Sequence, residues 1–154
     1  LCIKNIYPSR QTVLKKLDMR NIDDLHIFNR ILNSRSFNSD VFYVENSNAI
    51  CRWYATGLYA DYIYHSPKNN IILIYKTGPG RVLHLFDVIT DKKWELDDVL
   101  KLTVTEKYDK IIFYFSPFNE IISKCDKELN ETIMIKGRNE FLSQEFSHPV
   151  TAHA

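Results

Sequence analysis

Two side chains near the ends of apolar segments are candidates for acid–base chemistry. Asp87 lies near the C-terminal end of the apolar run Arg81–Ile89, and α/β folds place functional groups at the carboxyl ends of their strands. It is therefore a candidate general base, although a carboxylate at such a position can also cap a backbone turn. His84 stands between Leu83 and Leu85, which favours a histidine on a buried sheet face over a catalytic base.

Tyr114 is a further candidate, because a phenol can donate a proton and this tyrosine lies within the apolar segment Lys110–Phe115. The chain holds nine tyrosines, so only its position distinguishes it. His148 and His153 have no cysteine or carboxylate at the spacing of metal ligands. No metal site is therefore expected.

The elements that position Asp87 and His84 form a predicted hairpin. Asn70–Thr77 and Arg81–Ile89 are two apolar runs, and Gly78–Gly80 separates them with the sequence Gly-Pro-Gly. Glycine supplies positive φ and proline fixes its own φ, so this cluster predicts a tight turn. Neither run alternates with polar residues. Both are therefore predicted to be central strands that are covered on both faces.

A helical crossover is predicted to connect the hairpin to the segment that carries Tyr114. Apolar residues recur at helical spacing over Leu96–Thr103, and Asp97 and Asp98 lie where a helix N-terminus favours negative charge. The apolar segment Lys110–Phe115 follows as a strand. A strand, a crossover helix and a second strand predict that Arg81–Ile89 and Lys110–Phe115 are parallel.

Capping residues and periodicity predict the remaining elements. One helix begins after the N-cap Asn21 and extends through Leu32. A second helix is expected within Ser47–Ala60, and its apolar stripe of Ile50, Trp53, Tyr54 and Leu58 is expected in the core. The others are strands over Gln11–Asp18, Asp61–His65 and Thr132–Lys136, and a short helix after Ser116 and Pro117. The sum is one α/β (α+β) domain with a mixed central sheet and helices on both faces.

Composition limits the classes of partner. The 154 residues carry a formal net charge of +1, which gives no electrostatic reason to expect nucleic acid or an anionic membrane surface. No apolar stretch reaches the length of a membrane span. Cys2, Cys51 and Cys125 are few and distant, as is typical of reduced thiols, so a cytoplasmic protein is expected. Because the chain begins with Leu1, it is expected to be processed or a fragment of a longer protein.

The order of the predicted elements resembles the GNAT superfamily, the Gcn5-related N-acetyltransferases. Lys15–Leu25 is similar to their opening strand and first helix, Tyr62–Ile89 to their strands two to four, and Asp87–Phe115 to their cofactor-binding crossover. Bacterial members of the superfamily have local patterns similar to Asn33–Arg35, Glu45–Asn48, Leu83–Ile89 and Phe146–Ala154.

This resemblance implies a GNAT-like fold and an N-acetyltransferase that uses acetyl-CoA. The acceptor would be a small-molecule amine or a peptide. Asp87 would deprotonate the amine, and Tyr114 would protonate the leaving thiolate. Val88, Ile89 and Thr90, at the end of the fourth strand of the fold, would contact the cofactor.

The sequence departs from the GNAT pattern at the pyrophosphate loop. These enzymes carry glycines between the fourth strand and the next helix, whose backbone N–H groups hold the pyrophosphate. The corresponding segment here, Thr90–Leu96, contains no glycine and includes Trp94. Three hypotheses remain. Acetyl-CoA binds in an altered way, or the domain is a non-catalytic module that has lost the cofactor, or it is the partner of an adjacent GNAT domain in a tandem protein.

Overall fold

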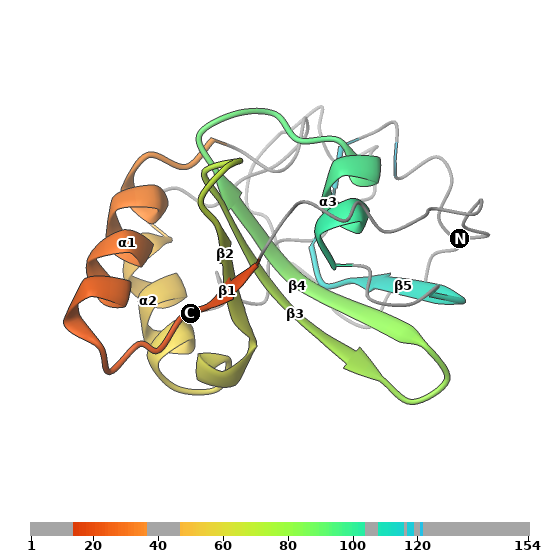
Figure 1. The fold of residues 1–154 in the computed structure, drawn as a ribbon, viewed down its shortest axis with the longest axis horizontal. Helices are drawn as coiled ribbons and strands as arrows, with labels where there is room; N and C mark the ends of the chain where they lie inside the picture. Colours follow the sequence, from red (N-terminus) through yellow and green to blue (C-terminus); the bar gives the residue numbers. More distant parts are fainter. Residues whose placement is uncertain (1–13, 37–46, 104–107, 116, 119–120, 122–154) are drawn as a thin grey trace, which may run out of the picture.

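A computed structural model of the chain describes residues 14–36, 47–103, 108–115, 117–118 and 121. Its sheet lies between a layer formed by α1 and α2 and a layer that contains α3 (Figure 1). The elements, in chain order, are β1 (Lys15–Lys16), α1 (Ile22–Asn33), α2 (Asn48–Thr56), the 3₁₀ helix η1 (Ala60–Tyr62), β2 (Ile63–Ser66), β3 (Ile71–Gly78), β4 (Val82–Thr90), α3 (Leu96–Thr103) and β5 (Lys110–Phe113).

The five strands lie in their sequence order, β1-β2-β3-β4-β5. Neighbours from β1 to β4 are antiparallel, whereas β4 and β5 are parallel. Leu83 lies opposite Ile111 in the parallel pair, which α3 connects across one face of the sheet. The predicted crossover and the predicted mixed sheet are therefore confirmed.

The N-cap of α1 fixes where this helix begins. Asn21 Oδ1 accepts hydrogen bonds from the backbone N–H groups of Asp23 and Asp24, at 2.9 and 3.2 Å, as the sequence predicts. The Asp24 carboxylate also accepts from the Lys15 ammonium and from the Asp18 N–H. The first turn of the helix is thereby tied to β1, the edge strand.

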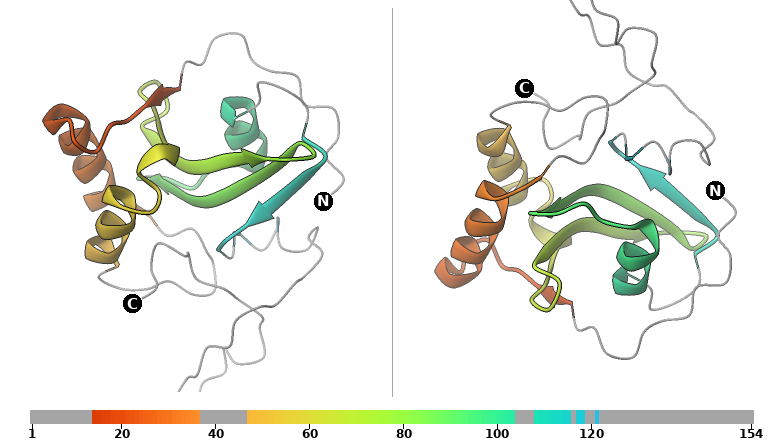
Figure 2. Two further views of the ribbon diagram at one scale, coloured as in Figure 1. Left: turned by 90° about the horizontal axis from the view of Figure 1, so that it is seen from below. Right: turned by 90° about the horizontal axis from the view of Figure 1, so that it is seen from above.

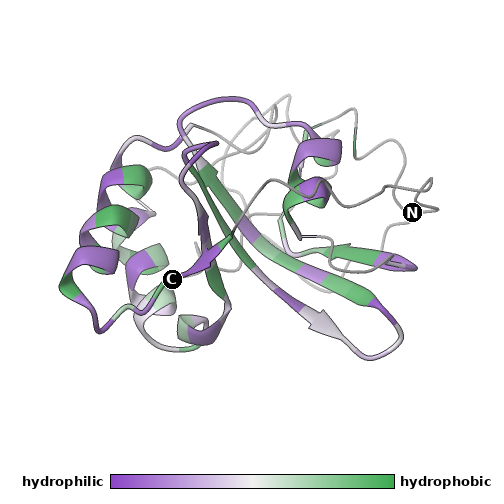
Figure 3. Ribbon diagram, in the orientation of Figure 1, coloured by the Kyte–Doolittle hydropathy of each residue, from purple (hydrophilic) through white to green (hydrophobic). Residues whose placement is uncertain are grey.

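Both faces of the sheet are covered, as the apolar runs of β3 and β4 predict. Ile72 and Ile74 of β3 pack into the core shared with α1 and α2, and Leu73 packs into the core shared with α3. Figure 3 shows hydrophobic residues along the strands, with hydrophilic residues on the outer parts of α1 and α3. The sheet is thus the middle layer of three.

The turn between β3 and β4 takes the predicted hairpin form. Gly80 has φ +69° and Arg81 has φ +56°, both in the left-handed region that favours glycine. The Arg81 guanidinium binds both oxygens of the Asp109 carboxylate at 2.6–2.9 Å, and the Asp109 N–H donates to the Arg81 carbonyl. This exposed pair links the hairpin to the start of β5.

The helix α2 lies within its predicted range, but it uses a different face. Its buried residues are Cys51 and Ala55, whereas Trp53 is 69% exposed and Leu58, just beyond the helix, is 67% exposed. The expectation that both belong to the core is therefore wrong. The small side chains of Cys51 and Ala55, four residues apart, face the core, and this turns Trp53 outward.

Other boundaries differ from the expected ones. Asp61 and Tyr62 belong to η1, so β2 begins at Ile63, and β1 is shorter than its predicted range. Several expectations lie outside the described residues, namely those on residues 11–13, the helix expected after Pro117, the strand Thr132–Lys136, Cys2, Cys125, His148 and His153.

Candidate functional site

A β-bulge interrupts β4 at Phe86. Ile74 of β3 lies opposite Asp87, but the next residue, Tyr75, lies opposite Leu85, so Phe86 is the additional residue. Phe86 packs into the core on the α1 and α2 side. Bulges bend a strand and end its regular pairing, and they are frequent beside active sites.

The ladder between β4 and β5 stops at this bulge. Its pairs run from Val82 and Lys110 to Leu85 and Phe113, and the Tyr114 N–H still donates to the Leu85 carbonyl at 3.0 Å. Among the described residues no further pair joins the two strands, although β4 continues to Thr90. Both views of Figure 2 show that β5 moves away from β4 toward the C-terminal end of β5.

His84 and Tyr114 form a hydrogen-bonded pair beside the bulge. His84 Nδ1 lies 3.0 Å from the Tyr114 hydroxyl. Desolvation, followed by the positive charge of Lys76, lowers the pKa of His84 below its usual value. The imidazole is therefore neutral at physiological pH, and one of its nitrogens is an acceptor. The sequence predicted His84 as a sheet-face histidine and gave no indication of this pair.

Aromatic rings surround the bulge residue. The Phe86 ring lies 4.5 Å from Tyr59 in a stacked arrangement and 4.8 Å from Tyr114, between ring centroids. The Lys76 ammonium lies 5.7 Å from the Phe86 centroid and 5.8 Å from that of Tyr62. Lys76 is also the residue opposite His84 in the sheet. The Lys76 ammonium, the His84 imidazole and the Tyr114 phenol therefore lie around the apolar ring of Phe86.

Asp87, the predicted base, is fully buried and ion-paired. Its carboxylate lies 3.2 and 3.4 Å from the guanidinium of Arg35, which follows α1. It also accepts the Val88 N–H at 2.8 Å. These contacts suit the alternative in which the carboxylate stabilises the backbone at a turn, here the bulge. A catalytic role for Asp87 stays a prediction.

The three predicted cofactor contacts complete β4. Val88, Ile89 and Thr90 are buried, with Val88 packed on the α3 side and Ile89 on the α1 side. The Thr90 carbonyl accepts from the Ser36 N–H at 2.7 Å and from its hydroxyl at 3.2 Å. Their side chains belong to the core, so a cofactor would meet this stretch through backbone groups. That role also stays a prediction.

The segment between β4 and α3 is built around a tryptophan. Trp94 is buried, and its ring lies 5.5 Å from that of Phe118 and 6.2 Å from that of Phe115. Lys93 lies over the Phe118 ring at 4.8 Å. The Glu95 carbonyl accepts hydrogen bonds from the N–H groups of Asp98 and Val99 in the first turn of α3. Apolar packing of a large side chain therefore holds this segment in place. A phosphate-binding loop would instead need small residues, so that the backbone can approach the phosphate.

The described residues were compared with the requirements of a metal site and of a membrane span. Within the described ranges, no three His, Cys, Asp or Glu side chains are grouped as metal ligands would be. Nor does any helix in those ranges combine the length and the apolar character that crossing a membrane requires. The chain matches no protein-family model, and neither a curated protein nor a solved structure matches it.

Sequence reasoning located the strands of the site but missed its side-chain partners. The Arg35–Asp87 and His84–Tyr114 pairs join residues 52 and 30 positions apart. The sequence predicted that β4 and β5 are parallel but not their register, and the structure aligns Leu85 with Phe113. It places the residues on either side of these two close together, on the same face of the sheet.

Proposed function

We propose that the chain is a GNAT-like domain that transfers an acetyl group from acetyl-CoA to an amine. The observation that carries the proposal is the parting of β4 and β5 at the β4 bulge, after a parallel pairing bridged by α3. In the GNAT resemblance, the space between these strands receives the pantetheine arm of the cofactor. The arm carries amide groups, which can hydrogen-bond to a strand edge as an added strand does.

His84 and Tyr114 supply the acid–base groups in this proposal. The neutral imidazole accepts the proton of the attacking amine, and the Tyr114 hydroxyl donates a proton to the departing thiolate. Asp87 is the alternative base, but its carboxylate is engaged by Arg35.

The pyrophosphate of the cofactor would need a grip other than a glycine loop. Lys92 is exposed before α3 and Lys93 lies over Phe118, so both offer positive charge in the matching segment. Phosphate binding by lysine requires no special backbone geometry. The binding would therefore be sensitive to salt.

A non-catalytic GNAT-like module, or the partner half of a tandem acetyltransferase, is the second candidate. The observation that favours it is the same segment, where Trp94 is buried and no glycine is present. Glu95, Asp97 and Asp98 are exposed at the start of α3 and would repel a pyrophosphate.

Calorimetry with acetyl-CoA and with CoA tests the proposal, alongside amide NMR spectra of the labelled chain. Binding should shift the amide signals of residues 85–88 and 112–114 more than those of α1. A variant with Lys92→Gln and Lys93→Gln should bind more weakly, whereas Lys68→Gln, a matched surface control in the β2–β3 turn, should bind as the unaltered chain does. Absence of binding at millimolar acetyl-CoA would remove the catalytic proposal and leave the second candidate.

A further inference from the structure

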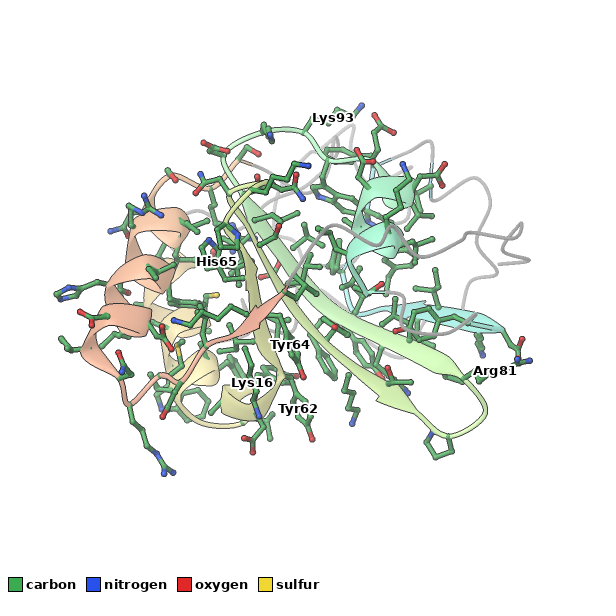
Figure 4. The ribbon with its side chains drawn as sticks, viewed as in Figure 1. Lys16, Tyr62, Tyr64, His65, Arg81 and Lys93 are labelled. Carbon is green, nitrogen blue, oxygen red and sulfur yellow. The ribbon has the colours of Figure 1, made fainter. Side chains whose placement is uncertain are left out.

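A hollow of about 400 Å³ lies beside the second half of β3. The β2–β3 ladder ends where Ile63 pairs with Ile74, but β3 continues to Gly78. Beyond that point one edge of β3 has no strand beside it in the described part of the chain, and the hollow follows this edge. Figure 4 shows Lys16, Tyr62 and Tyr64 together at the same end of β2.

Tyrosine rings make up much of the wall. Tyr62, Tyr64, Tyr75 and Tyr108 all line the hollow, and the rings of Tyr64 and Tyr75 lie 4.6 Å apart. Burial raises the pKa of Tyr75, so its hydroxyl stays protonated and is a hydrogen-bond donor. Flat aromatic walls with hydroxyl groups at their ends suit a ligand that contains a planar ring.

The charge at the rim favours an anionic group. Lys16 is paired with Asp61 at 3.3 Å, so these two charges offset each other. Lys76 also lines the hollow, and its ammonium rests on the rings of Tyr62 and Phe86 with no carboxylate within ion-pair distance among the described residues. One positive charge therefore remains for a ligand carboxylate to bind.

Lys76 also connects the hollow to the His84–Tyr114 pair. It lies opposite His84 in the sheet, and the Phe86 ring beneath its ammonium contacts Tyr114. A ligand whose ring enters the hollow and whose carboxylate binds Lys76 would hold an adjacent amine near that pair.

We infer that the hollow is the acceptor site and that the acceptor is an aromatic α-amino acid. The inference rests on the proposed acetyl transfer. In that step the amine nitrogen forms a bond to the thioester carbonyl carbon, and the carbon–sulfur bond breaks. His84 takes the amine proton, and CoA leaves as a thiolate that Tyr114 protonates.

Calorimetry without acetyl-CoA tests this site, with L-tryptophan and tryptamine as probes. The two molecules share the ring and the amine, but only tryptophan has the carboxylate. Tryptophan should bind at least about tenfold more tightly, as expected for one charge-assisted contact. Lys76→Met should abolish that preference, whereas Lys68→Met, which alters an exposed lysine in the β2–β3 turn, should preserve it. Tyr64→Leu should weaken both probes.

The outcomes separate the inference from the proposed function. Equal binding of the two probes, or no binding of either, overturns the aromatic amino acid while acetyl-CoA binding is measured independently. Tryptophan binding that depends on Lys76, in a chain that binds no acetyl-CoA, would establish the hollow as a site and remove acetyl transfer.

Discussion

Gly78 and His84 lie against each other across the β3–β4 hairpin. A Cβ atom on Gly78 would come within 2.7 Å of His84 Nε2 and 3.1 Å of its Cδ2. Gly80 is the glycine of this turn that has a positive φ, so the backbone of Gly78 does not demand glycine. The absence of a side chain at Gly78 is what leaves room for the imidazole that bonds to Tyr114.

Gly78→Ala is therefore expected to displace the His84 ring and break its bond to Tyr114. Overpacking of this kind costs about 1–3 kcal/mol of unfolding free energy. The pKa of His84 should rise toward its usual value as the ring moves into solvent, because desolvation is the main cause of its lowering. NMR of the imidazole nitrogens measures both the tautomer and the pKa.

Gly80→Ala is the matched control for that variant. The new side chain strains a left-handed backbone position, which costs about 1 kcal/mol, but no heavy atom lies within 4 Å of its Cβ. It should leave the His84 nitrogen signals unchanged. Identical His84 spectra in both variants would show that Gly78 does not hold the ring in place.

Tyr114→Phe is expected to lower acetyl transfer by about 100-fold in kcat, because it removes the proposed proton donor. The KM for acetyl-CoA should change little, and stability should fall by about 1 kcal/mol for the lost hydrogen bond. Tyr54→Phe removes a hydroxyl from an α2 ring that contacts Tyr59 and does not line the hollow, and it is the control. A drop in both variants alike would argue against a specific role for Tyr114.

The Arg35–Asp87 pair is expected to be worth more to the fold than to the chemistry. Arg35→Met removes the guanidinium that pairs with a fully buried carboxylate, which costs about 3 kcal/mol or more in unfolding free energy. Chemical denaturation measures this loss, and Arg81→Met, which breaks the exposed pair with Asp109, should cost under about 1 kcal/mol.

Asp87→Asn separates the two roles of that carboxylate. If Asp87 is the base, the variant loses acetyl transfer out of proportion to its stability. If Asp87 is structural, activity per folded molecule is retained, and the double variant with Arg35→Met is no less stable than Arg35→Met alone.

His65 should make the fold sensitive to mild acid. The ring is buried between β2 and α1, and neither of its nitrogens has a hydrogen-bond partner in the described part of the chain. Desolvation lowers its pKa, and Arg30 and Lys15 lower it further against the opposing effect of Asp24. Figure 4 shows His65 on the side of the sheet that faces α1.

The sign of the effect follows from the lowered pKa. The imidazole titrates near its usual pKa of 6.5 in the unfolded state and at a lower pKa in the folded state. Between these two pKa values the unfolded state binds more protons than the folded state. Above pH 6.5 both states are neutral and His65 adds no pH dependence, and the free energy of unfolding falls as the pH drops from 6.5 toward the folded pKa. His84, whose pKa is also lowered, contributes with the same sign.

His65→Leu should flatten this dependence and stabilise the protein at pH 7 by about 1–3 kcal/mol, since it removes unsatisfied buried polar atoms. Thermal melts from pH 5 to pH 7.5 measure the slope. Trp53→Leu alters an exposed side chain that does not titrate and should keep the original slope. An unchanged slope in His65→Leu would contradict a neutral, destabilising ring.

Local chemistry made much of the fold predictable. The Asn21 cap, the Gly-Pro-Gly turn and the two apolar runs are signals that act within a few residues, and each element appears as expected. The parallel β4–β5 pairing followed from the crossover rule. The bulge at Phe86 did not, because nothing in an apolar run marks which residue will be the additional one.

The site was less predictable because its contacts join distant parts of the chain. Asp87 was found through its position on a strand, but its partner Arg35 lies at the end of α1. The outward position of Trp53 was missed for a related reason. A helical stripe can be drawn through Ile50 and Trp53, and only tertiary packing through Cys51 and Ala55 decides which stripe is buried.

The two tryptophans give the molecule two optical reporters. Trp53 is 69% exposed on α2, and Trp94 is 5% exposed beneath α3. Iodide should quench the emission of Trp53 and spare Trp94, whose spectrum should be blue-shifted. A red shift of the Trp94 emission, the part that iodide does not quench, would then report in real time when the α3 layer loosens. No added label is needed.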